Sequence, residues 1–357
     1  MFGKMKKIQY TILAVTALMV LTACEKVSPI GILVSGTGVE DRVKMSHLYY
    51  QEHKRDYKYH DVSDQDEYTF LVGADSHLTT DDGRMREMLQ IGLDNNDILY
   101  AHLGDIADTK AEYYITLEDL INEYRWKYAR KYFKEFYFGD DDDPDQKANE
   151  SFYLYEDTIS EVSYSVSEVP YPFYPVVGNH DITHNGWALW SNIFHSSFYD
   201  VFVLVSLDPV LLDHFIFLDT ANGTLGEEQV NLIEEGVLDG KELAASLGQQ
   251  GSVFRNTFVF SHTNIFRPSS LQFSSTFARE ETFYLLKQFD KWNANIVFLG
   301  HVHKWDQQKN GDTEYLTLDS MCEANNPDPG DYLVRVHVKK DGTISWERVH
   351  MNYTPKK

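Results

Sequence analysis

The chain has 357 residues, of which 43% are hydrophobic and 14% aromatic, and its formal net charge is -23. This length and composition allow one large domain or two modest ones with a substantial core, which excludes global disorder. Because binding to nucleic acid polymers depends on clustered Lys and Arg, so acidic a chain is a poor candidate for that class. A small phosphorylated substrate is compatible with the acidic composition if bound cations reverse the local charge.

The N-terminus has the pattern of an export signal. Lysines near the start precede an apolar stretch at 8–21, which is short for a membrane span, and the sequence Leu-Thr-Ala-Cys then ends at Cys24. That tetrapeptide resembles the lipobox of bacterial lipoproteins, which implies a signal peptide at 1–23 and lipid attached to Cys24. An ordinary signal peptide or an uncleaved anchor is the alternative. We expect a membrane-anchored lipoprotein of the cell envelope that faces the periplasm or the exterior.

Between residues 24 and 66 the sequence is polar, and we expect a tether with at most one edge strand. The regular part begins with an apolar run at 68–73, which predicts a strand, followed by a helix at 81–93 and a strand at 98–103. Strands that alternate with helices indicate α/β architecture, with the site at the carboxyl edge of a sheet.

Two long stretches interrupt this alternation, near 109–172 and 182–213. In the first, Thr116 has the capping-box spacing to Asp119, which predicts a helix to about residue 136. The acidic run at 140–145 lacks the spacing of a calcium loop, and we interpret it as a solvated loop. The second stretch is expected to be irregular. Its rings either line a substrate cleft or pack in the core, and they are His184, Trp187, Trp190 and His195.

The remaining elements follow the same alternation towards the C-terminus. Asp341-Gly342 predicts a hairpin turn between the last two strands. We predict strands at 214–219, 257–260 and 296–299, helices at 227–238 and 279–292, and antiparallel strands at 315–318, 332–339 and 343–350.

Five short motifs share one feature, since each directly follows an apolar, strand-like run. Together they offer carboxylates, imidazoles and one amide but no thiolate, a set that suits Mn, Fe or Zn better than Ca or a cysteine-type zinc site. Seven ligands are too many for one open catalytic ion and suit two ions that share a carboxylate. The motifs are Asp75-Ser76-His77, Gly104-Asp105, Gly178-Asn179-His180-Asp181, Ser261-His262 and Gly300-His301-Val302-His303.

In this order the motifs resemble those of the calcineurin-like metallophosphoesterase superfamily, over residues 68–351. The resemblance implies an α/β fold with two stacked mixed β-sheets flanked by helices, and a catalytic domain at 67–357 that carries the two interrupting stretches as inserts. It also implies two transition-metal ions, Mn, Fe or Zn, at the strand ends. One ion would be held by Asp75, His77, Asp105 and His303, and the other by Asp105, Asn179, His262 and His301.

The resemblance further implies hydrolysis of a phosphate ester of a small molecule. The two ions, roughly 3.5–4 Å apart, would share a bridging hydroxide that attacks phosphorus. His180 would face the leaving oxygen, with its ring oriented by Asp181, and Asp108 would lie behind the ligands. A phosphodiesterase or a nucleotide-pyrophosphate hydrolase on the same core remains an alternative, as does a non-catalytic, metal-containing surface-binding lipoprotein. The family often has His-x-Pro after the ligand at His262, whereas Thr263-Asn264 stand here, which leaves the substrate open.

Overall fold

The computed structural model describes most of the chain from residue 38 onwards. The predictions for the signal peptide, Cys24 and the acidic run at 140–145 lie outside the described residues. Among the described helices, none has the length and apolar character needed to span a bilayer. The described residues are 38–52, 59–108, 110–132, 136–137, 152–156, 160–164, 172–240, 245, 253–266, 277–321 and 331–353.

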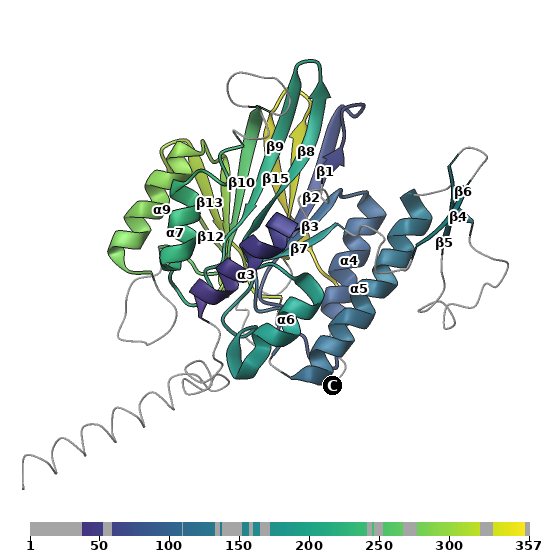
Figure 1. Ribbon diagram of the computed structural model, residues 1–357, viewed down its shortest axis with the longest axis horizontal. Helices are drawn as coiled ribbons and strands as arrows, with labels where there is room; N and C mark the ends of the chain where they lie inside the picture. The colour runs from purple at the N-terminus through teal and green to yellow at the C-terminus, as the bar shows by residue number, and fades with distance from the viewer. Residues whose placement is uncertain are drawn as a thin grey trace, which may run out of the picture.

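One of the two large sheets is five-stranded and mixed (Figure 1). Its strands run in the order β15-β14-β2-β3-β7. The pairs β2–β3 and β3–β7 are parallel, whereas β14 runs antiparallel to both β15 and β2. The bounds are β2 (Glu67–Gly73), β3 (Leu99–His102), β7 (Phe173–Pro175), β14 (Asp331–Lys339) and β15 (Ile344–His350).

The other large sheet is seven-stranded and also mixed, in the order β1-β8-β9-β10-β11-β13-β12. Its centre, from β9 to β13, is parallel, and the antiparallel pairs are β8–β9 and β12–β13. The bounds are β1 (Tyr59–Asp61), β8 (Tyr199–Leu207), β9 (Val210–Phe217), β10 (Phe254–Ser261), β11 (Ile296–Leu299), β12 (Asp306–Asn310) and β13 (Thr313–Thr317).

The two sheets stack face to face on an aromatic core. Phe70 of β2 packs edge-on against Phe215 of β9 and Phe258 of β10, with ring centroids 5.0 and 4.9 Å apart. Successive strand residues point to opposite faces, so Phe70 lies between the sheets while Leu71 lies in the core on the outer face. Because both faces are covered, these strands are continuously apolar rather than alternating.

Helices form the outer two layers of the sandwich (Figure 1). On the five-stranded sheet lie α4 (Gly83–Asn95), α5 (Ala111–Tyr132) and α6 (Gly186–Phe194), and on the seven-stranded sheet lie α3 (Val39–Glu52), α7 (Gly226–Glu234) and α9 (Arg279–Lys291). This arrangement confirms the predicted α/β class with two mixed sheets flanked by helices. The remaining described elements are η3 (Thr183–Asn185) and a small sheet of β4 (Phe136–Tyr137), β5 (Phe152–Glu156) and β6 (Ser160–Tyr164).

Some local predictions were wrong. Helix α5 begins at Ala111, so Thr116 is not a cap but an inner residue whose hydroxyl donates to the Glu112 carbonyl oxygen at 3.0 Å. The stretch 182–213 is not irregular, because it contains α6, β8 and the start of β9. Trp187 and Trp190 pack in the core, which is one of the two alternatives expected for the rings of this stretch, whereas His184 and His195 are exposed.

The two ends of the chain also differ from expectation. Within 24–66 the structure has a full helix, α3, and the short strand β1, which pairs in parallel with β8. At the C-terminal end, only β14 and β15 form the expected hairpin. Strand β13 instead joins the seven-stranded sheet beside the parallel strand β11, because its buried residues Tyr315 and Leu316 complete two hydrophobic layers there.

Candidate metal centre

All five motifs lie at the carboxyl ends of parallel strands. Strands β2, β3 and β7 of one sheet, and β10 and β11 of the other, each lead into one motif. Because parallel strands end at the same edge, the motifs meet at one end of the sandwich. The seven predicted ligands and His180 are buried or half-buried there.

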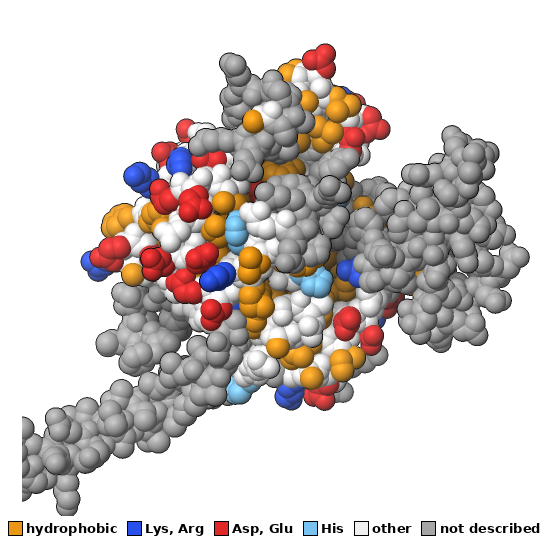
Figure 2. Space-filling model, in the orientation of Figure 1, with side chains coloured by type: hydrophobic (Ala, Val, Ile, Leu, Met, Phe, Trp, Pro, Cys, Tyr) orange, Lys and Arg blue, Asp and Glu red, His pale blue; other side chains and the backbone are white. Residues whose placement is uncertain are grey.

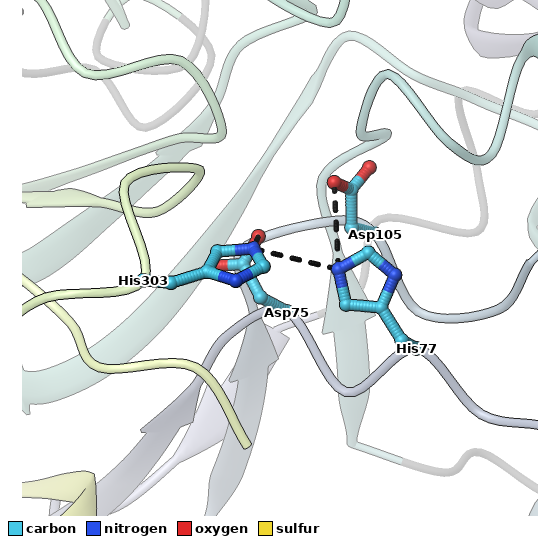
Figure 3. Close-up of side chains that lie close together, drawn as sticks. All are labelled: Asp75, His77, Asp105 and His303. Carbon is cyan, nitrogen blue, oxygen red and sulfur yellow. Dashed lines mark hydrogen bonds and ion pairs between the residues drawn. The ribbon is translucent and has the colours of Figure 1, made fainter. Parts of the chain in front are cut away.

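One cluster joins Asp75, His77, Asp105 and His303, whose ligand atoms all lie within 4.8 Å of one another (Figure 3). The Nε2 atom of His303 is 3.4 Å from an oxygen of Asp75 and 3.4 Å from Nε2 of His77. Nε2 of His77 is 3.9 Å from Asp105 Oδ2. These four residues are the set that the family resemblance assigned to one ion.

A second cluster joins Asp105, His262 and His301. The Nε2 atom of His262 is 3.5 Å from Asp105 Oδ2 and 2.9 Å from Asn179 Oδ1, which brings the amide to the same place. Asp105 therefore belongs to both clusters, as expected of a carboxylate shared by two ions. The structure brings all seven predicted ligands together, while their role as ligands stays a prediction.

The proton positions on His262 favour a cation at this place. Its Nδ1 lies 2.8 Å from the carbonyl oxygen of Leu103, which can only accept, so Nδ1 carries the proton of the neutral ring. Nε2 then presents a lone pair towards the Asn179 oxygen only 2.9 Å away. Two acceptors this close need a proton or a metal ion between them, or else the Asn179 amide turns its NH2 group towards the ring. An imidazole held by a carbonyl at its far nitrogen is the usual arrangement of a metal ligand.

Backbone strain is concentrated on the predicted ligands. Five of the seven have a positive φ, between 42° and 70°, although none is glycine. Such conformations cost on the order of 1–3 kcal/mol each and persist where the surrounding structure imposes them, often at functional sites. The five are Asp75, His77, Asp105, His301 and His303.

Gly178 is required for close approach rather than for an unusual backbone angle. A Cβ atom at this position would lie 2.1 Å from the backbone nitrogen of Asp105 and 2.3 Å from its Oδ1. The loop after β7 can therefore wrap directly over Asp105, whose Oδ1 accepts the His180 backbone N–H at 2.7 Å. Contact with Asp105 is therefore the reason for the glycine.

Asp108 links two imidazoles. Its Oδ1 is 3.2 Å from Nδ1 of His77 and 3.4 Å from Nδ1 of His180, and the two rings meet edge to face. These three residues also lie close enough to hold an ion. We interpret the carboxylate as the acceptor for both rings, because this leaves Nε2 of His77 directed into the first cluster. Asp108 therefore lies behind the ligands, where the sequence placed it.

Asp181 has partners other than the His180 ring. Its carboxylate accepts backbone N–H groups from Gly178, Ile106 and Ala107, at 2.8 to 3.3 Å. It also accepts the Tyr114 hydroxyl at 3.1 Å. The expected orienting contact is thus made by Asp108, and Asp181 instead ties the loops after β3 and β7 together. Burial, followed by the nearby charge of Asp105, raises the pKa of Asp181 to about 8.

The charges of the cluster favour ionised carboxylates. Burial by itself would raise the pKa of Asp105, but the positive charge that the His262 and His180 rings carry when protonated outweighs it and holds that pKa well below its usual range. Burial likewise opposes a lowered pKa for Asp75, and His303 reverses the balance. Fully buried carboxylates that stay ionised can bind cations at neutral pH.

Sequence reasoning missed His102, which lies on β3 under the clusters. It is fully buried, and neither ring nitrogen has a hydrogen-bond partner among the described residues. Burial lowers its pKa to about 3, so the ring stays neutral. The sequence signalled His102 only by its place in an apolar, strand-like run.

The structure also explains the pair Thr263-Asn264, which departs from the family's usual His-x-Pro. The Thr263 hydroxyl donates to the Thr220 carbonyl oxygen, and the Asn264 amide donates to the Thr317 hydroxyl. The sequence signalled Thr263-Asn264 only by their place just after a predicted strand.

Comparisons with known proteins give similar folds at low identity. No family model and no curated protein matches the chain. Among solved structures, GAP50, the anchor in the inner membrane complex of Plasmodium, has a TM-score of 0.46 at 12% identity, over 81% of this chain and 90% of that one. A dimetal phosphatase from Danio rerio has a TM-score of 0.40 at 11% identity, over 76% and 93%. A putative 5'-nucleotidase from Staphylococcus aureus has 0.41 at 10%, over 82% and 56%.

Proposed function

We propose that this protein is a binuclear metal-dependent hydrolase of phosphate esters. One observation carries the proposal: two clusters of oxygen and nitrogen donors share Asp105, and the His180–Asp108 pair lies directly beside them. The donors contain no thiolate, which suits Mn, Fe or Zn. The ions, when bound, would neutralise phosphate oxygens and lower the pKa of a water molecule between them.

His180 is the residue that we assign to the leaving group. Burial lowers its pKa, but in the metal-free chain the charges of Asp105 and Asp108 raise it to about 9. With Nδ1 directed at Asp108, the Nε2 proton is available to an oxygen that leaves the phosphorus atom. Its side chain is 15% exposed, which leaves this nitrogen within reach of a substrate.

The proposed substrate is a small phosphorylated molecule rather than a nucleic acid polymer. Figure 2 shows acidic side chains over the region of α7 and α9, in keeping with the net charge of -23. Such a surface repels a long polyanion, whereas a single phosphate group needs only the local positive charge of the ions. Degradation of plasmid DNA by the purified protein would contradict this part of the proposal.

We further propose that the protein is held at the cell envelope by lipid on Cys24. The export pattern of the first 24 residues supports this proposal. The expected outcome is incorporation of labelled palmitate into the membrane fraction, with loss of the label in Cys24→Ala. A wild-type protein that remains soluble and unlabelled in a lipoprotein-producing host would contradict it.

The enzymatic proposal is tested with chelated protein that starts at residue 24. Mn, Zn or Fe is added back, and p-nitrophenyl phosphate is compared with bis-p-nitrophenyl phosphate, so that the preferred ester separates a phosphatase from a phosphodiesterase. His180→Ala should lose roughly 10²–10⁴-fold in turnover while its metal content is unchanged. A protein that binds metal but hydrolyses neither these esters nor a nucleotide pyrophosphate would be a binding protein, and the proposal would fail.

A further inference from the structure

We propose that Arg42 is a positioning residue of the metal centre: from helix α3 it fixes the loop after β9, which in turn holds the predicted ligand His262. This inference rests on the proposed function. It assigns a role to a segment that precedes the first strand of the site and that the sequence indicated only as a tether. In Figure 1, α3 lies across the sandwich near α6 and α7.

Arg42 is fully buried and makes a bidentate pair with Asp219, which is also fully buried. Its Nε donates to Oδ2 and its Nη2 to Oδ1, both at 2.8 Å. Nη2 also donates to Asn222 Oδ1 at 2.7 Å. The guanidinium carbon lies 5.9 Å from the ring centroid of Trp187 in α6. One side chain of α3 thus contacts both the loop at 218–225 and a helix of the other outer layer.

The residue after Asp219 contacts the metal centre directly. The Thr220 hydroxyl oxygen accepts the backbone N–H of His262 at 3.1 Å and that of Thr263 at 3.0 Å. In return, the Thr263 hydroxyl donates to the Thr220 carbonyl oxygen at 2.6 Å. The backbone of the predicted ligand is therefore tied to the loop that Arg42 anchors.

His262 is then held at two points. Thr220 fixes its backbone, and the Leu103 carbonyl oxygen fixes its ring through Nδ1. If the loop after β9 moved, the backbone contact would shift while the ring contact stayed, and Nε2 would turn away from Asn179 and Asp105. A shift of under 1 Å is enough to impair a site that needs its ligands in a defined geometry.

Helix α3 has further attachments that keep Arg42 in place. The two carboxylate oxygens of Glu40 accept the N–H groups of Glu227 and Glu228, at 2.6 and 2.7 Å, and so cap the N-terminus of α7. The Ser46 hydroxyl accepts the backbone N–H of Ser197 at 2.8 Å. Helix α3 is therefore hydrogen-bonded to the start of α7 and to Ser197 before β8, and these bonds hold Arg42 against the loop at 218–225.

Loss of Arg42 would leave the Asp219 carboxylate buried and without its counter-charge. Such a group is strongly unfavourable unless it reaches water or takes up a proton. Either response alters the loop at 218–225, and Thr220 is the neighbouring residue. The effect should therefore appear at the cluster of Asp105, Asn179, His262 and His301 more than at the cluster that contains Asp75 and His77.

The test measures metal affinity by calorimetry and stoichiometry by elemental analysis, with Zn or Mn as the probe. Arg42→Met should bind the weaker of two ions about tenfold less tightly, within the range typical of residues that support metal ligands. Thr220→Val removes the hydroxyl that accepts from His262 and Thr263 and that also bonds to the Ser261 hydroxyl. It should give the same loss without a buried unpaired charge, so the test survives if Arg42→Met does not fold.

Arg335→Met is the matched control. Arg335 makes an equivalent bidentate pair with buried Asp97, at 3.0 Å, but Asp97 lies at the amino end of β3, away from the centre. It should lower the denaturation midpoint like Arg42→Met and leave both metal affinities unchanged. Equal metal affinities in wild type, Arg42→Met and Thr220→Val would overturn the inference, as would the same loss in Arg335→Met. His262→Ala distinguishes failure of this inference from failure of the proposed function. If this variant also binds both ions normally, the proposed metal centre itself is wrong.

Discussion

The buried carboxylates among the predicted ligands have different partners from the other buried carboxylates at the strand ends. At the amino ends, buried carboxylates are matched by arginine: Asp97 pairs with Arg335, and Asp213 pairs with Arg255 while also accepting the Tyr68 hydroxyl. At the carboxyl end of β9, Asp219 is likewise paired with Arg42. The equally buried Asp75 and Asp105 have no arginine or lysine within ion-pair distance among the described residues, and imidazoles surround them instead.

The difference shows which carboxylates can bind an ion. A guanidinium satisfies the carboxylate that it pairs with and leaves no room for a cation, so the arginine-paired carboxylates are not candidate metal ligands. Imidazoles that have lost a proton present lone pairs, so the cluster around Asp75 and Asp105 can offer a cation acceptors that no guanidinium occupies. Strained backbone at five predicted ligands accompanies this second arrangement.

The largest effect is expected from the carboxylate that both clusters share. Asp105→Asn removes the charge at the centre of the site, so both ions should be lost and turnover should fall to the background rate. Asp213→Asn, at the other end of the sandwich, is the control and should lower thermal stability while keeping the metal content. Elemental analysis and ester hydrolysis check both variants. An Asp105→Asn protein that still holds two ions would contradict the claim that both ions depend on this carboxylate.

A smaller effect is expected at Asp108, which touches His77 and His180 but belongs to neither predicted ligand set. Asp108→Asn should lower turnover about 10–100-fold, as is typical of partners behind metal ligands. Because the Asp108 charge helps to raise the pKa of His180, its loss should lower that pKa. The protonated ring is then lost earlier as pH rises, so the alkaline limb of the kcat profile should move to lower pH. An unmoved limb would contradict the assignment of His180 as the acid.

The smallest effect is expected at Gly178, where only packing changes. Gly178→Ala places a methyl group against the Asp105 backbone and should cost about 1–3 kcal/mol of unfolding free energy, as overpacking does. Metal content should fall with it, because Asp105 must shift. Gly38→Ala, where a Cβ meets nothing within 4 Å, should change neither. Chemical denaturation and metal analysis on the same samples would show whether stability and metal binding are coupled here.

The layered α/β class and the strand-end position of the motifs could be predicted, because continuous apolar runs mark strands that are covered on both faces. The grouping of the ligands followed from the resemblance alone, and the structure reproduces it in space. Helix α3 could not be predicted, since its buried face includes Arg42, whose partner Asp219 lies 177 residues away. The contact between Asp108 and His180 likewise depends on two loops that only the fold brings together.

The central claim is most directly tested by counting metal ions in the wild-type protein. The chelated chain is reconstituted with Mn, Zn or Fe and desalted, and the ions are measured by elemental analysis while p-nitrophenyl phosphate hydrolysis is followed on the same sample. The account predicts about two ions per chain and turnover that appears only with them. A protein that binds no transition metal under any of these conditions, or that hydrolyses the ester equally well without one, would contradict it.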